Sequence, residues 1–568
     1  MIVTSGQSHW RPDDAAKPLR DITLGDLLRE QAQRFGDRPA IIFDEPTISM
    51  RWTYAELDRE VDTLARALIA IGISAGDHVA VMSSNRPEWV LLEYALARIG
   101  AVLVTVNPAF KAEELRYLLT QGHISTLFCI DTFRGFSLAN MLGELMPDLA
   151  ACTDGQRQPQ QPFEHLRTVI SLGDTPIAGA LSFAKMLARA DEVDDATLAK
   201  RAAAVAPEDI AQIQYTSGTT GNPKGAMLTH YGTVNNAILA GDRAGYVESD
   251  VMVSAMPLFH TAGCVCNVMG MLAAGGCLVV MENFDAARML DLIEKHHGTI
   301  TNGVPTMYVR ILQDEKLKSR QRNLSSWRIA YTGGTSIPPS LMLELNERVG
   351  VDPVIIMGMT ECSPIITQTV PTDPLDEKVT NAGIPLPHVE LRIVDTQTGQ
   401  TVPLGQEGEL HIKGFLVTAG YFDMPEQTAQ TIDSEGWLHS GDLAVLDARG
   451  YLRIVGRIKD MLIRGGENIY PVEIEDRLLG HELVSEAQIV GVPDKEFGEE
   501  IFAFVVMRNG SALNPDALRQ WCREHMARHK VPRYIAAVDT LPQTANGKVR
   551  KVELRERANR MIAEGTAL

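Results

Sequence analysis

The segment at residues 215–225 has the composition of a phosphate-binding loop, Tyr-Thr-Ser-Gly-Thr-Thr-Gly-Asn-Pro-Lys-Gly. Its glycines allow successive backbone N–H groups to point at one anion, and its hydroxyls add further donors. Lys224 supplies a cation for a polyphosphate. The segment is not a Walker A loop, because no Gly-Lys-Ser/Thr closes a GxxxxG frame. We therefore predict a nucleotide phosphate site here, rather than a Ser/Thr/Gly-rich surface loop.

Three charged residues stand in contexts that suit ATP chemistry. Glu361 follows a glycine-containing turn and is a hard oxygen ligand of the kind that Mg²⁺ shares with phosphate oxygens. Asp442 can accept two hydroxyl protons, as a ribose clamp requires. Lys548 lies in a glycine-containing loop, where a mobile cation can meet developing negative charge. Each residue, read alone, also fits an ordinary role: a solvated carboxylate, a turn cap and a surface lysine.

Five segments, in this order, resemble the motifs of the adenylate-forming superfamily, which includes acyl- and aryl-CoA synthetases, peptide-synthetase adenylation domains and firefly luciferases. They lie at residues 215–225, 357–361, 436–442, 456–468 and 542–548. The resemblance implies an ATP-dependent ligase that forms an acyl-adenylate and passes the acyl group to coenzyme A, with Mg²⁺ as cofactor. Coenzyme A is the expected acceptor because the sequence contains no carrier or reductase domain after these motifs.

The resemblance also implies roles for individual residues. The implied catalytic residues are Lys548, Lys224, Glu361 and His260, and the implied metal ligands are Thr220 and Glu361. The implied cofactor-binding residues are Thr216, Ser217, Gly218, Thr219, Thr220, Gly221, Lys224, Gly333, Gly334, Thr335, Met357, Gly358, Met359, Thr360, Asp442, Arg457, Lys459, Gly465, Gly466 and Glu467. The family usually has an aromatic residue where Met357 stands, but a thioether can also cover the adenine ring.

The segment at residues 256–263 resembles the family's substrate gate. Phe259 is followed by His260, where an amino-acid-activating relative would carry an acid. The apolar residues that follow predict a pocket for an aliphatic or alicyclic tail. The expected pocket residues are His260, Val265, Val268, Gly303 and Thr306. The pattern looks most like medium- to long-chain fatty acyl-CoA synthetases, and an aryl or alicyclic acid is the alternative.

Two further function classes use a similar sequence. A luciferase-type oxidoreductase shares these motifs and would emit light with an aryl acid and oxygen. A silent nucleotide-binding regulatory protein would more often have lost Lys548 or Glu361, and both are present. The acid–CoA ligase is therefore our prediction.

Helix and strand patterns alternate along the chain, which predicts an α/β fold of helix-covered sheets. Thr53 and Glu56 form a capping box before a helical pattern that ends at Gly72. Strands are expected at residues 78–82 and 102–106, with a helix between them. We predict a large N-terminal adenylation domain at residues 1–456. A small mobile α+β domain, residues 457–568, would carry the catalytic lysine.

Composition excludes several function classes. The 568 residues carry 72 acids against 53 bases, a net charge of −19, which argues against nucleic-acid or anionic-membrane surfaces. The uncharged stretch 264–281 contains Gly270, Gly275 and Gly276, so we expect a buried helix, a turn and a strand rather than a membrane span. Seven scattered cysteines and the lack of a targeting pattern predict a cytoplasmic protein. The oligomeric state is left open, and a homodimer is one option.

Overall fold

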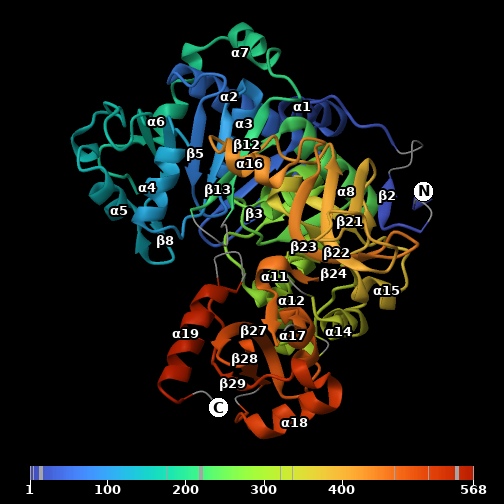
Figure 1. Ribbon diagram of the computed structural model, residues 1–568. Helices are drawn as coiled ribbons and strands as arrows, with labels where there is room; N and C mark the ends of the chain where they lie inside the picture. The colour runs from blue at the N-terminus through green and yellow to red at the C-terminus, as the bar shows by residue number, and fades with distance from the viewer. Residues whose placement is uncertain are drawn as a thin grey trace.

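We analysed a computed structural model that describes residues 2–3, 6–11, 17–173, 175–216, 222–319, 321–334, 337–465, 467–508, 511–543 and 549–566, without the side chains of residues 2, 3 and 468. The alternating pattern of the sequence folds into three sheets in the N-terminal part of the chain and one in the C-terminal part, together with a short two-stranded ribbon. The predicted α/β class is confirmed. Figure 1 shows the C-terminal elements grouped together at the bottom of the molecule.

The first sheet has seven strands, whose order is β11-β10-β7-β5-β6-β12-β13. Their bounds are β5 His78–Met82, β6 Val102–Val106, β7 Thr126–Ile130, β10 Thr168–Leu172, β11 Leu181–Ser182, β12 Ile210–Thr216 and β13 Lys224–Thr229. All pairs are parallel except β12 with β13, which form an antiparallel hairpin. The sheet thus ends in the hairpin that flanks the predicted phosphate loop.

The second sheet has nine strands in the order β20-β19-β18-β17-β16-β14-β15-β3-β4. Their bounds are β3 Pro39–Asp44, β4 Ser49–Thr53, β14 Val251–Ser254, β15 Cys277–Val280, β16 Ile300–Gly303, β17 Ile329–Gly333, β18 Asp352–Gly358, β19 Ile365–Gln368 and β20 Ile384–Pro385. The central strands β18 to β3 run parallel. Ligands in such sheets bind beyond the carboxyl ends of the strands.

The third sheet is antiparallel and has six strands in the order β1-β2-β21-β22-β23-β24. Their bounds are β1 Ile2–Val3, β2 His9–Arg11, β21 Val389–Val394, β22 Glu407–Gly414, β23 Leu438–Leu446 and β24 Leu452–Arg457. One continuous core of buried apolar side chains joins this sheet to the other two and to helices α1 Leu24–Phe35, α2 Tyr54–Ala70, α3 Pro87–Ile99 and α8 His230–Ala244. A second core packs helices α11 Ala286–His296, α12 Pro305–Leu312 and α14 Pro339–Val349 onto the nine-stranded sheet.

Local sequence signals set several of these elements. The predicted capping box is confirmed, since Thr53 accepts from the backbone N–H of Glu56 and the Glu56 side chain accepts from that of Thr53. Gly100 ends α3 in the left-handed conformation, with φ +72. The stretch from Cys264 folds as a buried π-helix, Cys264–Met269, followed by α10 Gly270–Ala274 and β15. Within the described ranges, no helix combines the length and apolar character that a bilayer crossing requires.

The C-terminal part builds its own sheet, β26-β25-β28-β27, with β29 paired to β28. Its strands are β25 Leu462–Arg464, β26 Glu467–Ile469, β27 Val484–Asp494, β28 Gly498–Met507 and β29 Tyr534–Ala537. Alternate residues of β28 enter two cores: Ile501, Ala503 and Val505 face helices α17 Pro471–Leu479 and α18 Pro515–His525, and Phe502 and Phe504 face α19 Lys551–Ala563. Arg457 still pairs in the six-stranded sheet, one residue beyond the predicted boundary.

Candidate active site

The β12–β13 hairpin brings Thr216 and Lys224 together at the end where the two strands are connected. The two residues are paired across the hairpin, and the Thr216 hydroxyl lies 3.5 Å from Glu361 Oε1. The ammonium group of Lys224 lies 4.8 Å from the centre of the Tyr421 ring. Ser217, Gly218, Thr219, Thr220 and Gly221 lie outside the described residues, so their predicted contacts with ATP and metal stay predictions.

Glu361 is a buried carboxylate in the one-turn 3-10 helix Thr360–Cys362, directly after β18. Its Oε1 accepts a hydrogen bond of 2.9 Å from the Tyr421 hydroxyl, and its backbone carbonyl accepts from the N–H of Thr418 at 2.8 Å. Among the described residues, no lysine or arginine lies within ion-pair distance of this carboxylate. A buried anion requires a compensating cation. The residues present therefore fit the predicted Mg²⁺ ion.

Tyr421 was missed by sequence reasoning. It follows the Thr418–Gly420 stretch, where Ala419 and Gly420 exchange backbone hydrogen bonds with Met227 of β13, and Tyr421 forms a bridge with Ala226. Burial raises the pKa of the Tyr421 hydroxyl, and the neighbouring Glu361 raises it further, so the group stays a proton donor. Only its place, between the motifs at residues 357–361 and 436–442 and directly after Gly420, could have pointed to it.

Glycines line the carboxyl ends of three neighbouring strands, β16, β17 and β18. A Cβ atom at Gly333 would lie 2.4 Å from Ile356 Cγ1 and 2.7 Å from the Ile356 carbonyl oxygen, and one at Gly358 would lie 2.4 Å from the Pro364 carbonyl oxygen. Gly303 pairs with Thr332, beside them. Side chains are excluded at Gly333 and Gly358, so the backbone itself forms this edge of the sheet. The structure thus places three predicted site residues, Gly303, Gly333 and Gly358, at neighbouring strand ends.

The remaining adenine-site predictions lie around these turns. Gly334 adopts φ +82, which favours glycine. Met357 is buried in the main core and Met359 packs against it, and Thr360 opens the 3-10 helix that carries Glu361. Thr335 lies outside the described residues. The stacking of Met357 on an adenine ring stays a prediction.

Asp442 and Arg457 face each other across β23 and β24. The Arg457 Nε donates to Asp442 Oδ1 at 2.8 Å, and the Asp442 side chain is only 8% exposed while that of Arg457 is 53% exposed. A residue of the same strand also holds the backbone of Asp442, because the Asp442 N–H donates a hydrogen bond to the Ser440 hydroxyl. The guanidinium partner fixes the direction of the carboxylate through a charge-assisted hydrogen bond. This arrangement suits a group that accepts hydrogen bonds from a ribose.

The predicted hinge residue Lys459 is exposed and lies in the 3-10 helix Ile458–Asp460, between β24 and β25. Asp460 pairs with Lys551 at 3.2 Å and lies 3.8 Å from Arg555, both on α19. Gly465 adopts φ +60 and donates its N–H to the Phe497 carbonyl, and Glu467 is exposed. Gly466 and Lys548 lie outside the described residues. The flanks of the lysine loop are close together, since Gln543 bridges Val549.

The predicted acid pocket lies around the π-helix. His260 caps the short helix Thr261–Gly263, and its Nδ1 accepts from the Ala262 N–H at 3.1 Å. Val265 and Val268 are fully buried, and Thr306, the second residue of α12, is partly exposed. Whether these residues contact the acid stays a prediction.

A buried polar chain beside this pocket was not predicted. Asn302 donates to Asn267 Oδ1 at 2.6 Å, and Asn267 donates to the Ser254 hydroxyl at 2.9 Å. The chain ties the π-helix to β14 and β16. Asn267 stood out in the sequence only as an interruption of an apolar run, so its partners could not be identified.

Three comparisons with known proteins agree with this geometry. The model of the AMP-binding enzyme family matches residues 28–422, and that of the AMP-binding enzyme C-terminal domain matches residues 473–548. The YngI protein of Bacillus subtilis is 40% identical over 95% of this chain and 98% of its own. A mouse mitochondrial medium-chain acyl-CoA ligase is 36% identical over 95% of this chain and 88% of its own.

The solved structure of an anthranilate CoA ligase in complex with anthranoyl-AMP superposes with a TM-score of 0.84 at 27% identity, covering 96% of this chain and 99% of that one. An ATP-bound MatB from Rhodopseudomonas palustris superposes with a TM-score of 0.78 at 28% identity, covering 95% and 100%. At the level of the family, the predictions of an AMP-forming acid–CoA ligase that uses ATP and coenzyme A are confirmed. The cytoplasmic location and the oligomeric state stay predictions. The chain belongs to the family of AMP-binding, adenylate-forming enzymes.

Proposed function

We propose that this enzyme activates a medium- to long-chain aliphatic acid and joins it to coenzyme A. The observation that supports the acid assignment is the apolar character of two expected pocket residues, Val265 and Val268, which lie on the π-helix and are fully buried. Their neighbour Asn267 carries no charge, and its amide is already hydrogen-bonded to Asn302 and Ser254, so it does not serve a charged substrate tail. The named substrate class of the mouse relative supports this assignment.

In the first step, a carboxylate oxygen of the acid attacks the α-phosphorus of ATP, and pyrophosphate leaves. Lys224 and the loop at residues 216–221 would bind the phosphates, and Glu361 with Thr220 would hold the Mg²⁺ that neutralises them. Lys548 would add positive charge as the new oxygen–phosphorus bond forms. Asp442, supported by Arg457, would hold the ribose, and the backbone at Gly333 and Gly358 would lie against the adenine.

In the second step, the sulfur of coenzyme A attacks the acyl carbonyl and AMP leaves. The proton of the thiol is lost, and a thioester bond replaces the anhydride bond to AMP. We propose that the C-terminal domain rotates about Lys459 between the steps, so that Lys548 withdraws and the loop at Gly465 and Gly466 approaches the thiol. His260, at the pocket mouth, would lie near the reacting carboxyl group.

A cavity beside α12 supports the coenzyme A step. It has a volume of about 470 Å³, and its lining residues include Ser84, Arg134, Glu282 and Arg310. Arg134 lies in the turn between the strands Thr132–Phe133 and Phe136–Ser137, and Arg310 lies on α12. Two guanidinium groups suit the phosphates of coenzyme A. We expect Arg134→Ala to raise the KM for coenzyme A while the KM for ATP is unchanged.

The test of the acid assignment is a carboxylate panel, scored for both AMP and CoA thioester. Each buried methylene contributes roughly 0.8 kcal/mol, or about fourfold in kcat/KM, so activity should climb from acetate through hexanoate until the pocket is full. Benzoate and cyclohexanecarboxylate test the alternative of an aryl or alicyclic acid. A preference for acetate or free amino acids would contradict the apolar pocket. Light emission in oxygen would identify a luciferase-type enzyme.

A further inference from the structure

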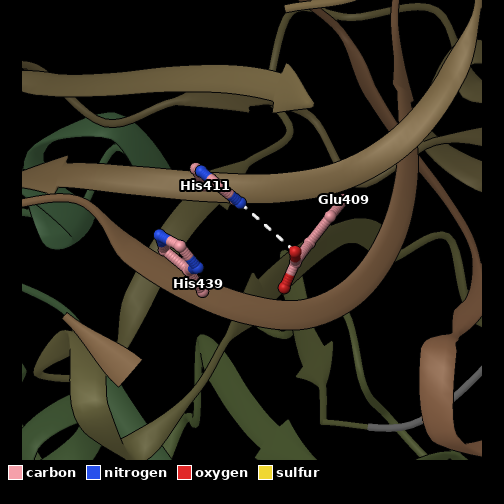
Figure 2. A group of neighbouring side chains, drawn as sticks. All are labelled: Glu409, His411 and His439. Carbon is pink, nitrogen blue, oxygen red and sulfur yellow. Dashed lines mark hydrogen bonds and ion pairs between the residues drawn. The ribbon is translucent and has the colours of Figure 1, made fainter. Parts of the chain in front are cut away.

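A cluster of two histidines and one glutamate lies on the six-stranded sheet, and none of the three residues has been assigned to ATP or to the acid. Glu409 and His411 stand two positions apart on β22, so both side chains lie on one face, and His439 lies directly opposite His411 on β23. One nitrogen from each histidine and one carboxylate oxygen of Glu409 all lie within 4.8 Å of one another. Figure 2 shows the two imidazole rings side by side, with the Glu409 carboxylate turned toward them.

We propose that this cluster, Glu409, His411 and His439, binds a divalent transition-metal ion of the zinc class. Two imidazole nitrogens and one carboxylate oxygen form a donor set that suits Zn²⁺ and related ions, and it leaves a fourth position for water. Mg²⁺ prefers oxygen ligands, so this site would not compete for the magnesium of the ATP reaction.

A ring nitrogen of His411 is available to a metal. The two rings stack with centroids 3.9 Å apart and an interplanar angle of 15°. Imidazole binds a metal through a ring nitrogen that carries no proton. The Nε2 of His411 donates to Glu409 at 3.2 Å, and within the described ranges its buried Nδ1 has no partner. Nothing described therefore prevents the proton from moving to Nδ1 and exposing the Nε2 lone pair to a metal.

Neighbouring groups orient the ligands. The second oxygen of Glu409 accepts from the Gly441 N–H at 3.1 Å, and Asp433 Oδ2 lies 3.4 Å from His439 Nε2. Such supporting hydrogen bonds fix the direction of metal ligands. Arg392, opposite His411 on β21, is a competing cation, but its guanidinium lies 4.2 Å from the centre of the Trp437 ring and 3.5 Å from Asp433.

Closure of the site requires a modest rotation. Tetrahedral ligand atoms around Zn²⁺ stand roughly 3.3 Å apart, closer than the 4.8 Å limit of the cluster, and stacked rings cannot both point at one ion. The His439 side chain is 36% exposed, whereas that of His411 is 5% exposed. His439 is therefore the ligand that turns, and the solvent side of its ring is the entry path for the metal.

The experiment is metal binding by the full-length, metal-free protein in the absence of substrates. Co²⁺ serves as the visible probe, and Zn²⁺ is measured by competition with a chromophoric chelator. We expect one equivalent of tightly bound metal, with a cobalt spectrum of nitrogen and oxygen ligands. His439→Gln and Glu409→Gln should each weaken binding at least about tenfold. The matched control is His525→Gln, on α18, whose histidine is exposed and outside the cluster.

Circular dichroism distinguishes loss of the site from loss of the fold. Substitution of His439 is less disruptive to folding than substitution of His411, because the His439 side chain is partly exposed. The proposal is overturned if the wild-type protein binds no stoichiometric Zn²⁺, or if His439→Gln and Glu409→Gln bind it as well as wild type. A cobalt–thiolate charge-transfer band would also overturn it, because the ligands would then be cysteines. None of these outcomes depends on the ligase reaction, so the failure of either proposal can be recognised separately.

Discussion

The hydroxyl of Tyr421 donates a 2.9 Å hydrogen bond to Oε1 of Glu361, 60 positions away in the sequence. The same ring lies 4.8 Å below the ammonium group of Lys224. One aromatic side chain therefore contacts both the proposed metal ligand and the proposed phosphate ligand. Tyr421 is a positioning residue in this arrangement, because it acts through Glu361 and Lys224 rather than on the substrate.

Tyr421→Phe should lower the apparent affinity of the adenylation reaction for Mg²⁺. The substitution keeps the ring beneath Lys224 but removes the donor that orients Glu361, and the loss of such a supporting bond typically costs about tenfold or more in metal affinity. The measurement is the apparent Mg²⁺ affinity in pyrophosphate exchange. The matched control is Tyr451→Phe, which loses an equivalent bond of 2.7 Å to Asp373 outside the site. Equal Mg²⁺ curves for the two variants would refute the positioning role.

Glu361→Gln should lower turnover on the order of a hundredfold or more. The amide keeps the shape of the side chain but removes the charge that holds the metal. Pyrophosphate release at saturating ATP is the measurement. Glu377→Gln, which alters a carboxylate paired with Arg449 on the surface, is the comparison variant. Adenylation at the wild-type rate by Glu361→Gln would contradict the assignment of Glu361 as a Mg²⁺ ligand.

Lys548→Ala and Lys459→Pro should separate the two half-reactions. The charge of Lys548 matters only while phosphate charge is rearranged, so its loss should abolish adenylation yet leave conversion of supplied acyl-adenylate to thioester. Proline at position 459 restricts φ in the exposed 3-10 helix between β24 and β25, so it should preserve adenylation and block thioester formation.

Each of these two variants is assayed with ATP and with synthetic acyl-adenylate. Lys459→Ala, which removes the charge but leaves the backbone free, distinguishes an effect of rotation from an effect of the ammonium group. Equal losses by Lys548→Ala and Lys459→Pro in both steps would mean a folding defect and would refute the hinge.

His230 should make the fold sensitive to acid. Burial lowers the pKa of this residue, at the start of α8, from 6.5 to about 4, and its Nδ1 accepts from the Leu24 N–H at 3.4 Å. Between these two values, the unfolded chain binds a proton that the folded chain does not. The contribution is therefore fully present above the unfolded pKa and is lost as pH falls toward the folded pKa.

We expect the Tm of the wild-type protein to fall between about pH 7 and pH 5, and His230→Gln to fall less over the same range, because its amide does not titrate. His525→Gln, an exposed histidine variant, should follow the wild type. A His230→Gln profile parallel to the wild-type profile would show that this histidine does not carry the dependence. The Tm is measured by circular dichroism without substrates.

The sequence alone determined the features that depend on neighbours along the chain. The capping box at Thr53 and the strands at residues 78–82 and 102–106 follow from local rules of backbone geometry, and each stands where it was predicted. The order of the motifs also identified the family, because this order can be read directly from the sequence without knowing which side chains are in contact.

Only the tertiary structure decided which distant side chains meet. Tyr421 reaches Glu361, Arg457 pairs with Asp442, and His439 stacks on His411. The periodicity of a strand shows which face a residue occupies, but not which strand lies beside it or in what register. These contacts depend on sheet order and on the packing of segments that the sequence keeps apart. The residues that support the active site, and the proposed metal site, could therefore be recognised only after the strands were placed together.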